Sequence, residues 1–222
     1  NYVKQDLARH KPCHAPSSVP DYCTPLVYAA QSDRLFHNLG GGRFADVSER
    51  AGIAAGEAPA LGVVVADYNG DGWPDIYVAN DARPNYLWIN QGDGRFSDEA
   101  FFSGAAVNMA GAAEGSMGIG AGDFDNDGDL DIFVAAELDD TVFWYEQVPG
   151  APIGWVAHPA ATDLLSVDAV VAATVDDDAT LDLVVAASIP GLVSRVDQIS
   201  WLDNELLSRS WRRPAWNRIS SA

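Results

Sequence analysis

Short apolar runs alternate with acidic loops along most of the chain. An apolar run at residues 62–66 is followed by a polar stretch at 67–75 and a second apolar run at 76–79. The same order recurs within residues 118–136 and 169–187. The runs are rich in β-branched residues and too short for helices, so they predict strands, and their near-continuous apolar character predicts burial on both faces.

The three units form an internal repeat. Their closing aspartates, Asp75, Asp131 and Asp182, lie 56 and 51 residues apart. A second element, residues 33–46, recurs 52 residues later at 85–98 and predicts a hairpin with a Gly-rich turn and an anchoring phenylalanine, Phe44 or Phe96. Degenerate copies of this hairpin lie at 141–156 and 198–219. Four strands in about 50 residues are typical of one blade of a β-propeller.

The repeats therefore predict an all-β fold, a β-propeller with four-stranded blades. Residues 25–222 hold about three to four blades, and we expect an open segment of a larger ring rather than a closed ring of about four. Residues 1–24 are expected to form a separate N-terminal arm. The Gly- and Ala-rich stretch 103–117 predicts a long loop between blades, with a short helix as the alternative.

The acidic loops 67–75 and 123–131 both fit the pattern D-x-[DN]-x-D-G-x-x-D. Calcium binds six to eight hard oxygens, which a tight turn with glycine at position 6 can bring together from positions 1, 3, 5, 7 and 9. The alternative is that these residues simply form polar turns. Matched spacing and flanking strands in both loops favour Ca²⁺ as the cofactor. The predicted ligands, with a backbone carbonyl at position 7, are Asp67, Asn69, Asp71, Trp73 and Asp75, then Asp123, Asp125, Asp127, Asp129 and Asp131.

The third loop departs from this pattern, with Thr174 at position 1 and Ala179 at position 6. It retains Asp176, Asp178 and Asp182. Without the first carboxylate and the glycine, it predicts a weak metal site or an empty loop.

The chain contains two cysteines, Cys13 and Cys23, in a Pro-rich segment. A disulfide between them would add roughly 2–3 kcal/mol of stability and would imply an oxidising compartment. A metal site that includes His10 and His14, or free thiols, are the alternatives.

Charge and hydropathy exclude two classes of partner. The net charge of −19 argues against nucleic acid and against an anionic membrane surface. No apolar run approaches the roughly 20 residues of a membrane-spanning helix, so membrane insertion is not expected.

The repeats resemble a known family. The residues Asp71-Gly-Trp-Pro-Asp-Ile-Tyr-Val, Asn90-Gln-Gly-Asp-Gly-Arg-Phe and Ser116-Met-Gly-Ile-Gly are similar to FG-GAP/VCBS propeller repeats, and most closely to the ASPIC/UnbV group of the cartilage acidic protein type. The resemblance covers nearly half of the chain. It implies a secreted, calcium-binding propeller with adhesive or matrix roles.

These observations predict an extracellular binding, adhesion or structural scaffold module with a protein or glycan ligand. The sequence lacks the common catalytic motifs, such as GxSxG, HExxH and the P-loop, so a non-enzymatic role is expected. One alternative is a subunit that self-associates into an oligomer or filament. Another is a polysaccharide lyase or hydrolase built on a propeller, since carboxylates are plentiful.

Overall fold

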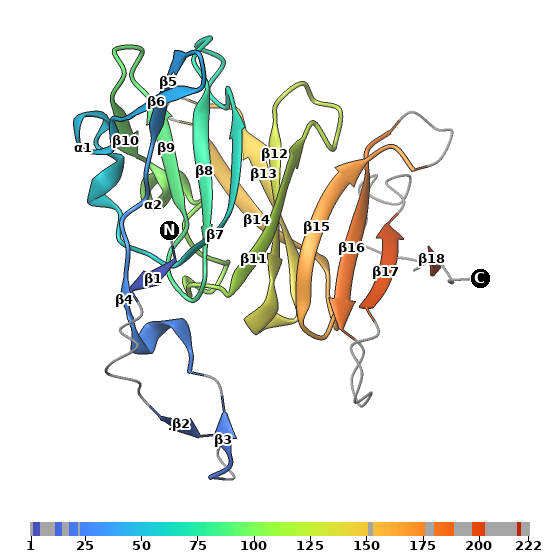
Figure 1. Cartoon of the computed structure of the whole chain (residues 1–222). Helices are drawn as coiled ribbons and strands as arrows, with labels where there is room; N and C mark the ends of the chain where they lie inside the picture. Colours follow the sequence, from blue (N-terminus) through green and yellow to red (C-terminus); the bar gives the residue numbers. More distant parts are fainter. Residues whose placement is uncertain are drawn as a thin grey trace.

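The computed structural model describes residues 2–4, 12–14, 18–21, 23–150, 153–175, 180–188, 197–202 and 217–218. Its strands form three four-stranded antiparallel sheets that stand side by side as an open fan (Figure 1). The fold is all-β and consists of propeller blades, as the sequence predicts. The described blades do not close into a ring.

Each blade is a meander in which consecutive strands pair. Blade 1 contains β7 (Ala60–Ala66), β8 (Asp75–Asn80), β9 (Tyr86–Asn90) and β10 (Phe96–Asp98). Blade 2 contains β11 (Ser116–Gly122), β12 (Asp131–Ala136), β13 (Thr141–Val148) and β14 (Gly154–Ala161). Blade 3 contains β15 (Val167–Ala173), β16 (Asp182–Ser188), β17 (Asp197–Leu202) and β18 (Asn217–Arg218). The hairpin of β5 (Phe36–Gly40) and β6 (Arg43–Asp46) precedes blade 1.

Short helices connect these strands. They are α1 (Ser48–Ala51) and α2 (Ala100–Ser103), with the 3₁₀ turns η2 (Pro25–Val27), η3 (Ile53–Ala55) and η4 (Glu137–Asp139). Residues 104–115 lack regular structure, which agrees with the predicted loop between blades. None of the helices in the described part of the chain has the length and apolar character needed to cross a membrane.

The described residues form three hydrophobic clusters, one at each of the two blade junctions and a third between blade 1 and the α1–η3 segment. Tyr77, Ile132 and Tyr145 fill the core between blades 1 and 2, whereas Phe124 and Leu183 belong to the core between blades 2 and 3. The inner strands β7, β11 and β15 contact one another in that order. Packing across both junctions therefore holds the fan together and sets the position of the loops between inner strands.

Glycines allow the inner strands β11 and β15 to approach closely. A Cβ atom on Gly118 would lie only 2.6 Å from the Ala169 Cα atom, well inside van der Waals contact. The repeat-equivalent residue Gly62 instead faces the flexible side chain of Ile119, at 3.2 Å from its Cγ1 atom. A side chain at Gly118 would have to displace backbone, so glycine is required there for packing.

Burial of the inner strands differs from the prediction for β7 and for β15, where Val171 is 56% exposed. Strands β8 and β12 are mostly buried on both faces, as expected. Strand β7 is not, because Leu61, Val63 and Val65 are exposed on the face that points away from blade 2. Within the described residues, no inner strand of a preceding blade covers that face.

The N-terminal arm contacts the blades at its start. Strand β1 (Val3–Lys4) pairs with β4 (Ala29–Ala30), and the Tyr2 hydroxyl donates a hydrogen bond of 2.6 Å to Asp81 Oδ2. The second arm hairpin, β2 (Cys13–His14) with β3 (Pro20–Asp21), extends away from the blades (Figure 1). The domain boundary at residue 24 stays a prediction.

The predicted disulfide is confirmed, since Cys13 and Cys23 are bonded to each other. Neither sulfur is free to bind a metal, so the alternatives of a metal site with His10 and His14 and of free thiols are wrong. His10 lies outside the described residues.

Candidate metal centre

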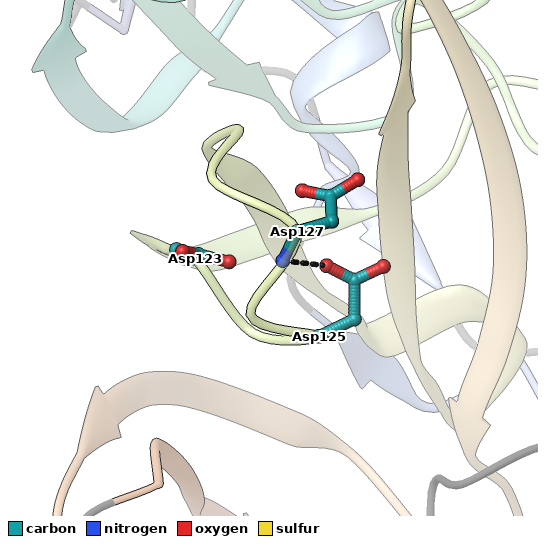
Figure 2. Close-up of side chains that lie close together, drawn as sticks. All are labelled: Asp123, Asp125 and Asp127. Atoms are coloured by element: carbon teal, nitrogen blue, oxygen red, sulfur yellow. Dashed lines mark hydrogen bonds between the residues drawn. The ribbon is translucent and has the colours of Figure 1, made fainter.

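The β11–β12 loop brings three carboxylates together. One oxygen from each of Asp123, Asp125 and Asp127 lies within 4.8 Å of the others (Figure 2). The backbone N–H of Asp127 donates to Asp125 Oδ1 at 3.2 Å, and that of Asp129 donates to Asp127 Oδ1 at 2.9 Å. These bonds hold the turn so that side chains from alternate positions face a common point.

Two residues of this loop adopt left-handed backbone conformations. Asn126 has φ of 59° and Gly128 has φ of 98°. Asparagine tolerates this region better than most residues, and glycine enters it without steric cost. The equivalent residues of the first loop, Gly70 and Gly72, have φ of 71° and 88°. The glycine predicted at position 6 thus provides the sharp reversal in both loops.

In the second loop, one carboxylate oxygen lacks a hydrogen-bond donor and one carboxyl has a raised pKa. The Asp123 Oδ1 atom is buried and has no hydrogen-bond partner in the structure. Burial raises the pKa of the Asp125 carboxyl, and the nearby charge of Asp127 raises it further. A buried oxygen without a donor is costly, and a cation at the common point would satisfy it.

The β7–β8 loop has a similar turn with a different ligand set. Asp67 accepts hydrogen bonds from the backbone N–H groups of Asp71 and Gly72, at 3.1 and 2.8 Å. Asn69 donates from Nδ2 to Asp71 Oδ2 at 3.0 Å, and the Trp73 N–H donates to Asp71 Oδ1 at 2.8 Å. Positions 1, 3 and 5 of this loop supply two carboxylates and an amide. Backbone N–H groups of the same loop already stabilise both carboxylates by hydrogen bonds.

Both loops lie at the same end of the blades, at the top of Figure 1. The Trp73 side chain is half-exposed there and covers the β9–β10 turn, where a Cβ atom on Gly92 would lie 2.9 Å from Trp73 Nε1. Its ring therefore braces the loop against the neighbouring hairpin. Coordination by the Trp73 carbonyl stays a prediction.

The aspartates that close the loops are buried inside the sheets. Asp131 accepts hydrogen bonds from the backbone N–H groups of Phe124 and Gln147, at 3.2 and 3.0 Å. In blade 1, Asp75 accepts the equivalent pair from Tyr68 and Asn90, at 3.1 and 2.8 Å.

Each closing aspartate thus ties the start of its loop to the third strand of its blade. Burial raises the pKa of Asp131 to about 7 and also raises the pKa of Asp75. This bracing role was missed from the sequence, where both residues were assigned to the metal alone. The sequence signal for this role is the large aromatic residue at position 2 of each loop, Tyr68 or Phe124. Its side chain is buried, and its backbone N–H donates to the closing aspartate.

The third loop is described only in part. Asp176 and Asp178 lie outside the described residues. Asp182 is buried and accepts a hydrogen bond of 2.9 Å from the Val175 N–H, so it repeats one bond of the other closing aspartates. Calcium binding by this loop stays a prediction.

Glu114 is a buried residue between blades 1 and 2 that belongs to no recognisable sequence motif. Glu114 is 1% exposed, and its Oε1 atom accepts a hydrogen bond of 3.3 Å from the Tyr145 hydroxyl. Its Oε2 atom is buried without a hydrogen-bond partner. Burial, with the nearby charge of Asp139, raises its pKa to about 8. Glu114 lies in a Gly- and Ala-rich loop, so nothing in the local sequence predicted its burial.

Comparison with known proteins shows which family the chain belongs to and which proteins are similar to it. The model of the FG-GAP-like repeat family matches residues 24–78 and 67–134, which together make up half of the chain. Cartilage acidic protein 1 of Mus musculus is 36% identical over 105 residues, covering 45% of this chain and 15% of that protein. The Xenopus tropicalis protein of the same name is 31% identical over 122 residues, covering 49% of this chain and 18% of that protein. The chain thus spans less than a fifth of these curated relatives. The two segments that the family model matches include the acidic loops 67–75 and 123–131.

Proposed function

The chain belongs to the FG-GAP-like repeat family, and on this premise we propose that it is an extracellular calcium-binding propeller module for adhesion, ligand binding or structural scaffolding. The observation that carries the proposal is the cluster of Asp123, Asp125 and Asp127, with its buried oxygen that has no donor. Hard anionic oxygens from a tight turn form the donor set that calcium prefers.

The residues of each loop divide into two roles. Asp123, Asp125 and Asp127 would hold the ion in the second loop, and Asp67, Asn69 and Asp71 would hold it in the first. The carbonyls of Trp73 and Asp129 and the carboxylates of Asp75 and Asp131 are the further proposed ligands. The closing aspartates also brace the backbone, so the same residue would couple the ion to the third strand.

Bound calcium would neutralise carboxylates that otherwise repel one another at one end of the blades. Extracellular modules bind calcium with dissociation constants of about 10⁻⁴–10⁻³ M. At ten times its dissociation constant, one site adds about 1.4 kcal/mol to the free energy of unfolding. Occupied loops would present a rigid surface to a protein or glycan ligand.

Two features support a location outside the cell. The Cys13–Cys23 disulfide is typical of proteins in oxidising compartments. The name of the relatives describes acidic proteins of cartilage, and this chain is itself strongly acidic, with a net charge of −19. Self-association and polysaccharide lyase or hydrolase activity stay alternative predictions, which sedimentation and turnover on a glycan panel would test.

The proposal is tested by thermal unfolding in calcium and in EDTA, with Asp125→Asn as the variant. Asp168→Asn is the matched control, since Asp168 is an exposed aspartate on β15 outside the loops. One occupied site should raise the melting temperature by about 3–6 °C, from roughly 2–4 °C per kcal/mol for a chain of this size. Asp125→Asn should lose most of one such increment, whereas the control should respond as the unmodified chain does.

Calorimetric titration with CaCl₂ provides an independent measurement. It should show one site fewer, or one markedly weakened site, in Asp125→Asn. If Asp125→Asn and the unmodified chain bind calcium equally, the assignment of the second loop is wrong.

A further inference from the structure

The short helix α2 exposes two phenylalanines that are adjacent in the sequence. Phe101 is 73% exposed and Phe102 is 85% exposed, whereas Ala100 and Ser103 at the two ends of the helix are buried. The helix therefore packs on the blades through its small residues and directs its largest side chains outward. Adjoining apolar side chains with this degree of exposure are typical of a surface that binds a partner.

The internal repeat shows that the fold does not require these phenylalanines. Helix α1 lies 52 residues earlier in the sequence. In both helices the first backbone N–H donates to an aspartate two residues before it, at 3.1 Å, and both helices end at a glycine with positive φ. At the two positions of the phenylalanines, α1 has the exposed charged residues Glu49 and Arg50. The same helix thus forms with a charged pair, so the aromatic pair of α2 needs an explanation outside the packing of the blades.

A groove of about 300 Å³ lies beside α2, at the junction of blades 1 and 2. A Cβ atom on Gly104, at the end of α2, would lie 2.6 Å from the Trp155 carbonyl oxygen of β14, so the helix sits directly against blade 2. The groove is lined by Asn69, Ile89, Glu99, Phe102, Ser103 and Ile153. Ile89 and Ile153 also pack against the core between the blades, so the floor of the groove is apolar and belongs to the packed junction.

The rim of this groove is acidic. Within the described part of the chain, Glu99 takes part in no salt bridge, and none of the residues that line the groove is basic. Asn69 belongs to the first acidic loop and donates a hydrogen bond of 3.0 Å to Asp71 Oδ2. The carboxylates of Glu99 and Asp71 therefore border an apolar floor, and a bound group with positive charge would complement them.

We propose that the groove beside α2 binds a segment of a partner protein in which an apolar side chain is flanked by lysine or arginine. The apolar side chain would lie on Ile89 and Ile153. The cation would face Glu99 or the exposed ring of Phe102, since aromatic faces attract cations. The inference rests on the proposed function in one respect, the role of the chain as a ligand-binding module, and it does not depend on calcium.

The chemistry of the groove favours this occupant over three others. A sugar would bury hydroxyl groups against two isoleucines, and a buried hydroxyl without a hydrogen-bond partner is costly. A second copy of this chain would bring like charge to an acidic rim, because the net charge of the chain is −19. An anionic membrane surface would meet the same repulsion.

The test uses a double variant, Phe101→Glu with Phe102→Arg, which gives α2 the charged pair of α1. A library of random displayed peptides is first depleted on this variant and then selected on the immobilised unmodified chain. The selection is carried out in EDTA, so that its outcome does not depend on bound metal. The recovered peptides should share an apolar residue next to lysine or arginine.

Fluorescence anisotropy with a labelled recovered peptide gives the affinities. The double variant should bind about tenfold or more weakly, because it loses the apolar wall of the groove. Glu99→Gln should weaken binding at low salt and much less at high salt, since its effect is electrostatic. Phe44→Arg is the matched control: the predicted anchor Phe44 is 60% exposed on β6 and does not line the groove, so binding should be unchanged.

Several results would overturn the proposal. They are a selection without enrichment over the double variant, recovered peptides that are acidic or uncharged, and equal affinities for the double variant and the unmodified chain. A concentration-dependent dimer or binding to a glycan array that the double variant loses, without any selected peptide, would also overturn it, because a second copy or a glycan would then occupy the groove. Calorimetric titration of the same proteins with CaCl₂ reports the calcium sites separately, so a failure of calcium binding is distinguished from a failure of peptide docking.

Discussion

Replacing Glu114 by glutamine should remove a loss of stability that the unmodified chain suffers as pH rises. Burial raises the pKa of this carboxyl from its ordinary value of 4.5 to about 8 in the folded protein. Between these two values the folded state binds more protons than the unfolded state, so the free energy of unfolding falls with increasing pH. The loss of unfolding free energy begins near the unfolded-state pKa of 4.5 and is complete above the folded-state pKa of about 8.

The magnitude follows from the pKa shift. One pKa unit corresponds to about 1.4 kcal/mol, so the raised pKa of Glu114 lowers the free energy of unfolding by on the order of 3 kcal/mol at pH 7, where the carboxyl is ionised in the unfolded state and mostly protonated in the folded state. The structural cause is that Oε2 has no donor and that Tyr145 gives Oε1 a single bond of 3.3 Å. Glutamine has nearly the same shape and remains neutral, so it keeps the packing without the charge.

Urea unfolding of both proteins, measured between about pH 5 and pH 8, checks this expectation. The difference in unfolding free energy between variant and unmodified chain should grow by roughly 3 kcal/mol in favour of the variant over that range. Taking the difference cancels the contributions of other carboxyls, such as Asp131, that titrate over the same interval. A difference that is independent of pH would refute the reasoning, since it would mean that the pKa of Glu114 is the same in the folded and unfolded states.

Two further predictions concern packing and the closing aspartates. Gly118→Ala should destabilise the chain by about 1–3 kcal/mol, because its Cβ would meet the Ala169 backbone, whereas Gly62→Ala at the equivalent site should change the unfolding free energy by less than about 1 kcal/mol. Equal effects in urea unfolding would contradict this account of the junction. Asp131→Asn should lower the unfolding free energy by about 1–3 kcal/mol even in EDTA, because an amide leaves one backbone N–H, such as that of Gln147, without its acceptor. A loss seen only in calcium would show that the residue acts through the ion alone.

Local spacing was enough to predict much of this protein. The repeat of apolar run, acidic loop and apolar run placed the strands β7–β8 and β11–β12 and the turn glycines Gly72 and Gly128. These features depend on backbone geometry within a few residues, which sequence encodes directly. With only two cysteines in the chain, the disulfide also had a single intramolecular pairing.

Burial between blades could not be predicted in the same way. Val63 and Ile119 occupy equivalent positions in similarly apolar strands, yet Val63 is exposed and Ile119 is packed, because among the described residues only Ile119 has a blade beside it. Glu114 is buried beside Tyr145 of β13, which is 31 residues away in the sequence, and Asp131 is buried where it accepts hydrogen bonds from two backbone N–H groups. The sequence by itself determined the strands, the loops and the positions of the loop carboxylates, whereas the tertiary structure decided which carboxyls and apolar faces are covered, because burial depends on the neighbours that the fold brings together.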